Sequence, residues 1–233
     1  MDLNEKLKEV YLSNWNELSN EMNKINEDST KTIKPANPLL IKVNKEYEIA
    51  DIRILIFGQE TNGWEGDFTG DLSVSLNVYD EFFNSEKCFS YGGQFWNGVS
   101  RFLKIINEKF PNKKVSFLWN NVVKIGGSGS DINCPPEYIY NLEKKLFNVV
   151  DKEIEVLNPN VIIFFSGPNY DEKIKNCLKE IDFKSVSNEY DIRKITRIEY
   201  KNYKNIFRTY HPNYLWRNDI DSYLNTIIEN INL

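Results

Sequence analysis

Three runs of apolar residues constrain the fold of this chain more than any other feature. They are "IRILIF" at 52–57, "VSFLWN" at 115–120 and "NPNVIIFFSG" at 158–167. Each run is typical of a strand buried on both faces, because its apolar residues do not alternate strictly with polar ones. Helical segments separate the runs, and this order predicts a parallel sheet between two layers of helices.

The remaining segments complete this α/β pattern. Helices are expected at about 137–156, at 170–181 and at the end of the chain, and "KITRIEY" and "NIFRTY" are expected to pair as strands around "KNYK". We therefore expect an α/β fold, a three-layer α/β/α sandwich around a central, mainly parallel four-stranded sheet. Before the second strand, a helix carries its apolar residues on one face: Phe95, Trp96, Val99, Phe102, Leu103 and Ile106.

The N-terminal part has a different character. Apolar residues at helical spacing predict one amphipathic helix over residues 3–27, followed by a polar loop with two prolines at 28–38. "LLIKV" is a short extended piece. We expect residues 1–45 to form a helical and extended segment that packs on a domain formed by residues 46–233.

Composition limits the classes of function. The formal net charge of -5 and the pI of about 5.2 give no general attraction to nucleic acid, although a local basic face is compatible with them. No apolar run has the length of a membrane span, and the N-terminus lacks the layout of a signal peptide, so we expect a cytoplasmic protein with no membrane partner. We also expect a monomer. The three cysteines are widely spaced without a CxxC pair, which argues against a disulfide framework and a metal site.

The strand ends are where a ligand is expected, because α/β sheets bind ligands beyond the carboxyl ends of their strands. The first strand ends in "GQETNGW" and the second in Asn120 and Asn121. The third ends in "SGPN" at 166–169, and the last in His211 and Pro212.

Taken in this order, the four segments resemble motifs of the uracil-DNA glycosylase superfamily. "GQETNGW" stands where that family has its water-activating loop, Gly-Gln-Asp-Pro-Tyr-His or Gly-X-Asn-Pro-Gly. "FLWNNVVKI" looks like the strand that ends in the base-reading asparagine, and "VIIFFSGPNYDEKI" is similar to the family's strand, glycine and helix start. "TYHPNYLWRN" resembles the His-Pro-Ser-Pro-Leu-Ser loop. The resemblance runs from about residue 50 to the C-terminus. It implies an enzyme that removes a base from DNA without a cofactor.

Two residues would carry the chemistry. Breaking an N-glycosidic bond builds positive charge on the sugar and negative charge on the leaving base. Glu60 matches the family's Asp or Asn, and it would stabilise the sugar cation and orient a water. His211, the only histidine, would face the base carbonyl. The sequence departs from the family where Glu replaces Asp and where Thr61 begins a different continuation of the loop.

Other residues would hold the base after it leaves the helix stack. Asn120 would read its edge, with Asn121 taking that part under a one-residue slip. Gly58 would let a ligand approach the backbone, and Gln59 would offer its N–H to a base carbonyl. Phe68 would be the aromatic platform, with Trp64 as the alternative.

The last loop would contact the DNA itself. Leu215 would be the wedge that fills the gap left by the base, with its neighbours Tyr214 and Trp216 as alternatives. Arg217 would hold a phosphate, and Asn213 would also contact DNA. "GGSGS" at 126–130 is compatible with a phosphate-contacting loop and equally with a flexible connection.

Two further interpretations stay open. The scaffold can be a binding module for DNA or for a protein, with catalysis lost, which the loop substitutions and the acidic balance favour. It can also be a nucleotide- or nucleoside-binding hydrolase unrelated to DNA, because a fold does not determine a function.

Overall fold

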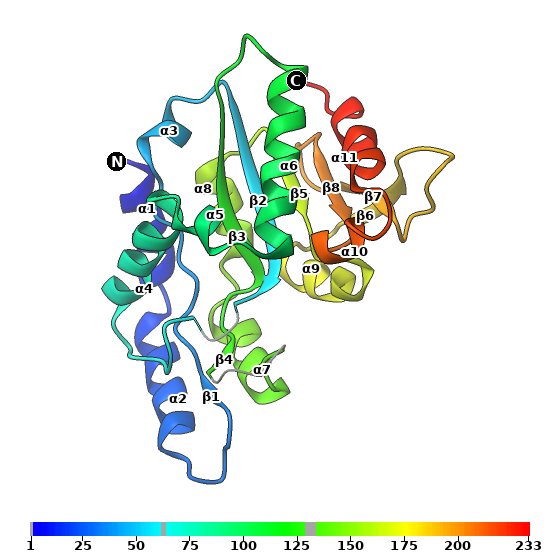
Figure 1. Cartoon of the computed structure of the whole chain (residues 1–233). Helices are drawn as coiled ribbons and strands as arrows, with labels where there is room; N and C mark the ends of the chain where they lie inside the picture. The colour runs from blue at the N-terminus through cyan, green and yellow to red at the C-terminus, as the bar shows by residue number, and fades with distance from the viewer. Residues whose placement is uncertain (1, 62–63, 129–133) are drawn as a thin grey trace.

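The computed structural model describes residues 2–61, 64–128 and 134–233, and it has a central sheet of six strands in the order β3-β2-β5-β8-β7-β6 (Figure 1). Four neighbouring strands, β3, β2, β5 and β8, run parallel; β7 pairs antiparallel with β8, and β6 pairs antiparallel with β7. The strands are β2 (Ile52–Glu60), β3 (Val115–Val123), β5 (Val161–Phe164), β6 (Asp182–Ser185), β7 (Ile195–Glu199) and β8 (Ile206–Thr209).

The expected four-stranded sheet is therefore corrected to a mixed sheet of six strands. The parallel part is present, and β7 and β8 pair antiparallel as "KITRIEY" and "NIFRTY" predicted. Sequence reasoning missed β6 because its residues are mostly exposed, and only Phe183 among them is apolar. A short, polar strand at a sheet edge carries no run of apolar residues to reveal it.

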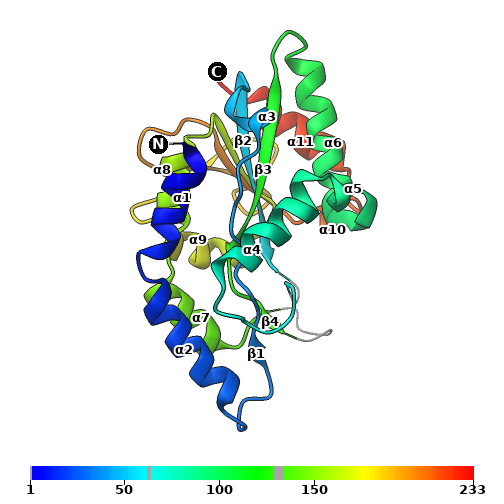
Figure 2. The ribbon, with the colours of Figure 1, turned by 90° about the vertical axis from the view of Figure 1, so that its left-hand side faces the viewer.

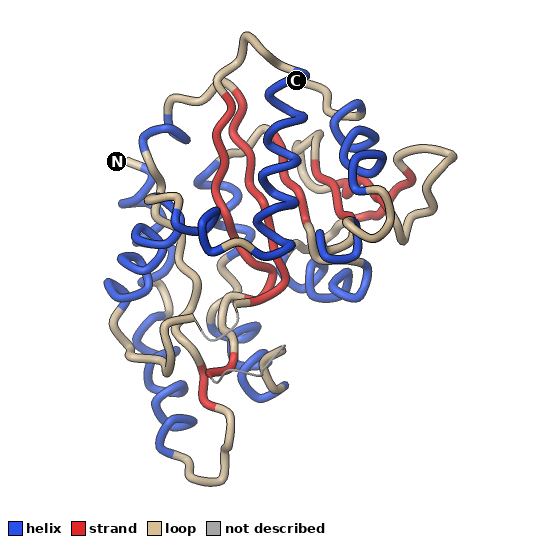
Figure 3. The backbone as a smooth tube through the Cα atoms, viewed as in Figure 1, coloured by secondary structure: helices blue, strands red, loops and turns tan. Residues whose placement is uncertain are grey.

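The centre of the sheet is buried on both faces, as the apolar runs indicated. All residues of β5 and β8 are buried. Phe57 of β2 lies beside Phe164 of β5, and their rings stack with centroids 4.5 Å apart. Figure 3 shows the parallel strands side by side, so that their carboxyl ends lie at one edge of the sheet.

Helices cover both faces of the sheet, with α6, α10 and α11 on one face and α8 and α9 on the other (Figures 1 and 2).

Two predicted helices are shorter than expected: the one at 137–156 is divided into α7 and α8, and the one at 170–181 ends at Cys177. The helices that follow β2 are α4 (Leu72–Tyr79), a π-helical turn η1 (Asp80–Asn84), α5 (Lys87–Tyr91), α6 (Gly93–Lys109), α7 (Glu137–Leu146), α8 (Val150–Leu157), the 3₁₀ turn η2 (Pro168–Tyr170), α9 (Asp171–Cys177), α10 (Pro212–Leu215) and α11 (Ile220–Glu229).

The N-terminal segment packs on the rest of the chain, but the helix predicted over 3–27 is divided into α1 (Leu3–Leu12) and α2 (Trp15–Glu27). Asn14, with a backbone at φ -130° and ψ 14°, interrupts the helical conformation. The segment is anchored by Tyr11, whose hydroxyl donates to Glu153 Oε1 at 2.7 Å and accepts from the Ile41 amide at 3.0 Å. "LLIKV" is buried without forming a strand, and it leads into the short helix α3 (Lys45–Glu48).

A small second sheet lies below the central one and pairs β1 (Lys34–Pro35) with β4 (Gly127–Ser128). Gly126 precedes β4, and a Cβ atom there would lie 2.2 Å from the carbonyl oxygen of Thr61, so the position needs glycine. The first residues of "GGSGS" are thus strand-paired, and Ser128 is the last of them that the structure describes. Over the described ranges, no helix combines the length and the apolarity that crossing a membrane requires.

Candidate active site

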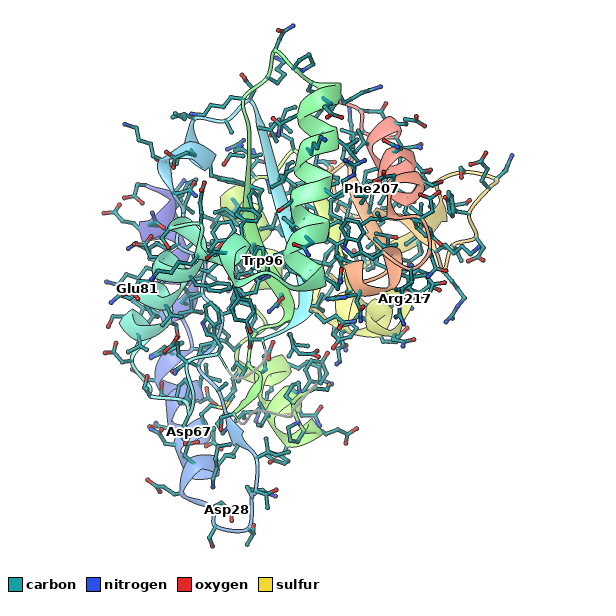
Figure 4. All side chains as sticks on the ribbon, viewed as in Figure 1. Asp28, Asp67, Glu81, Trp96, Phe207 and Arg217 are labelled. Carbon is teal, nitrogen blue, oxygen red and sulfur yellow. The ribbon has the colours of Figure 1, made fainter. Side chains whose placement is uncertain are left out.

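Two adjoining cavities lie where the parallel strands end. The first, of about 470 Å³, is lined by residues that follow or end β2, β3 and β8 and by the start of α6. The second, of about 420 Å³, lies between the segment after β5 and the segment after β8. Gln59, His211 and Asn213 line both cavities. In Figure 4, Trp96 of the first cavity and Arg217 of the second lie toward the same end of the sheet.

Gly58 is required by the side chain opposite it. A Cβ atom at this position would lie 2.5 Å from Asn121 Oδ1 and 3.3 Å from the ring of Phe95. The Asn121 amide therefore crosses directly over the backbone of β2. Gly58 also lines the first cavity.

Gln59 joins two strand ends. Its side-chain Nε2 donates to the carbonyl oxygen of Ser166 at 2.7 Å, which ties the end of β2 to the turn that follows β5. This hydrogen bond fixes the Gln59 side chain between the two cavities.

Glu60 is the last residue of β2, so it projects from the sheet and not from the loop that was expected. It lines the first cavity, and the hydroxyl of Tyr170 donates a hydrogen bond to its Oε2. Burial raises the pKa of Glu60 to about 7, because a charged carboxylate loses its hydration there, and the nearby charge of Lys173 opposes this rise.

His211 lines the same cavity and directly precedes α10. Its Nδ1 accepts a hydrogen bond from the Asn213 backbone N–H at 3.2 Å. Because a backbone amide can only donate, Nδ1 carries no proton, and the neutral ring carries its proton on Nε2. Burial also lowers the pKa of His211 below its ordinary value, which favours this neutral form.

Asn120 does not reach the cavities, which corrects its prediction as the base-reading residue. Its side chain is buried on the other face of β3, where Nδ2 donates to Glu153 Oε2 at 2.9 Å and Oδ1 accepts from Lys124 Nζ. Neighbouring strand residues point to opposite faces, so Asn121 faces the first cavity instead. The one-residue slip that the sequence left open is the arrangement found.

Phe68 is also away from both cavities, because its ring packs in the core against Trp15 with centroids 5.9 Å apart. Trp64, the alternative platform, is partly buried against Phe82 and Trp119. Neither is the platform that the sequence predicted. The aromatic residues that line the first cavity are Tyr91, Phe95, Trp96 and Trp119.

Phe95 is the functional candidate that sequence reasoning assigned to the core. Its ring stacks on the His211 imidazole, with centroids 5.7 Å apart and an interplanar angle of 29°. The available signal was its adjacency to Trp96, since two neighbouring helical residues do not share one face. Tyr91 adds a ring that is 78% exposed at the rim of this cavity.

Leu215 is completely buried, at 0% exposure, and this corrects its prediction as the DNA wedge. Pro212 begins the single turn α10, and the last residue of this turn packs inward. Asn213 and Arg217 line the second cavity, where Arg217 Nε donates to the Asn213 carbonyl oxygen at 3.1 Å. Of the alternatives to Leu215, Trp216 is 41% exposed and Tyr214 packs against Tyr210 in a tilted arrangement.

The second cavity is lined by a cationic residue that the sequence did not indicate as part of a site. Arg193 lies between β6 and β7, and its backbone carbonyl accepts from the buried guanidinium of Arg208 at 2.7 Å. Arg208 is in turn held by Asp171. Of the described residues around the two cavities, only Arg193 and Arg217 are permanently cationic, and they line the same one.

Three buried polar atoms beside the cavities have no hydrogen-bond partner among the described residues. They are Trp119 Nε1, Asn121 Nδ2 and Ser166 Oγ. Buried polar groups are normally paired, so such atoms at a cavity are suited to pair with a ligand or an ordered water. No cluster of three or more His, Cys, Asp or Glu side chains that could hold a metal occurs in the described ranges.

The first cavity thus combines three kinds of chemistry. Glu60 offers a carboxyl that can orient a water, His211 offers an N–H donor from a neutral ring, and Asn121 offers an amide. They come from β2, β3 and the segment after β8, which are distant in sequence.

Comparisons with known proteins place the chain in no family: no protein-family model matches it, and no curated protein is significantly similar to it.

Proposed function

We propose that this protein is a DNA glycosylase of the uracil-DNA glycosylase type, which hydrolyses the N-glycosidic bond of uracil or another modified base in DNA. The observation that carries the proposal is the meeting of Glu60, Asn121 and His211 in one cavity. These residues stand on three of the four strand ends that resemble the motifs of that family.

In the proposed reaction the base enters the first cavity. Asn121 pairs with its edge, and the ring of Phe95 packs beside it. His211 donates from Nε2 to a base carbonyl, where negative charge builds as the bond breaks. Glu60, as a carboxylate, faces the sugar, where it stabilises positive charge and orients the attacking water. No cofactor enters this scheme.

The second cavity supplies a place for the DNA backbone. Arg193 and Arg217 bring positive charge to it, and Gln59 and Asn213 connect it with the base cavity. We assign the gap-filling role to the exposed aromatic residues at the rim, Tyr91 and Trp216, in place of the buried Leu215. The expected monomeric state and cytoplasmic location remain part of the proposal.

The test is base removal from uracil-containing oligonucleotides, single- and double-stranded, followed by alkali to break the strand at each abasic site. The wild-type protein is expected to give breaks, and Glu60→Gln and His211→Gln are each expected to reduce their rate by about 10²-fold or more. Glu172→Gln is the matched control, because Glu172 is exposed on α9 and its carboxylate, among the residues that the structure describes, pairs only with Lys175. Equal rates in all four proteins would contradict the proposed site.

A second candidate is a binding module without catalysis. The net charge of -5 and the confinement of cavity cations to Arg193 and Arg217 favour it, because DNA enzymes usually have a larger basic footprint. Tight binding of uracil-containing DNA without any strand break would support the module. Release of base would exclude it.

A further inference from the structure

Tyr170 is positioned to act on Glu60. It ends the 3₁₀ turn η2, which begins after Gly167, and the positive φ of 76° at that glycine turns the chain back from β5 toward β2. The ring of Tyr170 is buried, and its hydroxyl donates to Glu60 Oε2. A donor on a carboxylate oxygen restricts the rotation of the carboxyl group and favours its charged form.

Lys173 is placed behind this tyrosine. It lies three residues further on in α9, and its Nζ is 4.3 Å from the centroid of the Tyr170 ring. The same ammonium lies 5.3 Å from the centroid of the Tyr140 ring and contacts Cys134 Sγ at 3.4 Å. A cation over a phenol ring withdraws electron density from it, so the Tyr170 hydroxyl becomes a stronger donor.

The two residues oppose the effect of burial on Glu60. Burial favours the neutral carboxyl, whereas the Tyr170 hydrogen bond and the Lys173 charge both favour the carboxylate. The other titratable side chains that line this cavity with Glu60 are those of Tyr91 and His211, and His211 is neutral by the geometry of its Nδ1.

We propose that Tyr170 and Lys173 are positioning residues that favour the ionised form of Glu60 against the effect of burial and fix its orientation at the cavity wall. The catalytic meaning of this pair rests on the proposed function, because a glycosylase needs Glu60 as a carboxylate. The physical arrangement itself can be measured without any activity.

The measurement is a carbon-13 NMR titration of the Glu60 side-chain carboxyl, identified by the signal that disappears in Glu60→Gln. In the wild-type protein the midpoint is expected at about 7. Tyr170→Phe, which keeps the ring, and Lys173→Met are each expected to move the midpoint upward by about one pH unit. Lys173→Arg keeps the charge and is expected to restore most of the wild-type value.

Two controls match these variants. Tyr140→Phe removes the hydroxyl of the other ring beside Lys173, which bonds to Asn176 and not to Glu60. Lys175→Met removes a lysine on the same helix that pairs with Glu172. Both controls are expected to leave the Glu60 midpoint unchanged. An unchanged midpoint in Tyr170→Phe and Lys173→Met, with the rest of the spectrum intact, would overturn the inference.

Base release then separates the two proposals. If the wild-type protein releases base, the low-pH limb of its rate profile is expected to move upward in Tyr170→Phe and Lys173→Met, with kcat affected more than KM. If it releases none while the midpoints shift as expected, the proposed function fails and the positioning of Glu60 stands.

Discussion

At the scale of single residues, burial shifts the pKa values of Glu60 and His211 and so sets the pH range in which the proposed reaction can run. The pKa of Glu60 rises to about 7 and the pKa of His211 falls below its ordinary value. Below the Glu60 midpoint the carboxyl is protonated and cannot stabilise a cation, whereas above it both groups have the required form. The rate of base release is therefore expected to rise with pH through about 7 and then to level off.

This expectation is checked by single-turnover rates measured from about pH 5 to about pH 9. A rate that falls as the pH rises through this range would contradict the assigned charge states. Glu60→Gln is expected to abolish the rising limb, since the amide does not titrate.

Gly58 offers a second test at the residue scale. Gly58→Ala would place a methyl group 2.5 Å from Asn121 Oδ1, so the amide has to move. We expect a loss of about 1–3 kcal/mol in the free energy of unfolding, measured by urea titration, and a loss of base affinity. Adding Asn121→Ser to Gly58→Ala is expected to restore the stability and not the affinity. Full stability in Gly58→Ala alone would show that the two groups are not in contact.

At the scale of elements, the two faces of β3 have different roles: one contributes to a buried polar network and the other to the candidate site. Asn120 belongs to a buried network with Lys124 and Glu153, while Asn121 belongs to the cavity. Asn120→Ala is expected to lower the free energy of unfolding by about 1–3 kcal/mol, because Lys124 and Glu153 each lose one hydrogen bond in a buried network, and to spare activity. Asn121→Ala is expected to spare stability and lower activity. Urea unfolding and base release measured on both variants check this, and the reverse pattern would contradict the register of β3.

The same elements show what a sequence can and cannot reveal. The apolar runs identify β2, β3 and β5, because double-sided burial leaves a direct trace in the residue types. They do not reveal which of Asn120 and Asn121 faces the cavity, since a one-residue change of register would exchange the faces of the sheet on which the two side chains lie. The prediction of Leu215 as the DNA wedge is wrong for a related reason. The turn of α10 directs this side chain inward, and the residue types of a loop motif do not show that direction.

At the scale of the whole molecule, Glu60, Asn121 and His211 meet because parallel strands end at one edge of the sheet. Strand order in sequence therefore predicted which segments would supply the site. Residues from other elements escaped prediction. Phe95, Arg193 and Tyr170 reach the cavities or Glu60 from helices and connections whose placement depends on tertiary packing.

The charge of the whole molecule predicts how it should bind DNA. With a net charge of -5 and two cations at the second cavity, the affinity should depend only weakly on salt. Arg217→Ala is expected to reduce the slope of log affinity against log salt concentration by about 1, and Arg193→Ala by a similar amount. Fluorescence anisotropy at several salt concentrations measures these slopes, with Arg53→Ala as a control far from the cavities at the start of β2. Slopes unaffected by either cavity arginine would exclude this cavity as a phosphate site.

The central claim is that three strand ends build one base-releasing site. Its most direct test is a screen for free base by mass spectrometry, using oligonucleotides that carry uracil and a panel of other modified bases. One or more bases are expected to be released by the wild-type protein and by Glu172→Gln, and at a much lower rate by Glu60→Gln and Asn121→Ala. Release of no base from any oligonucleotide, or undiminished release by Glu60→Gln, would contradict it.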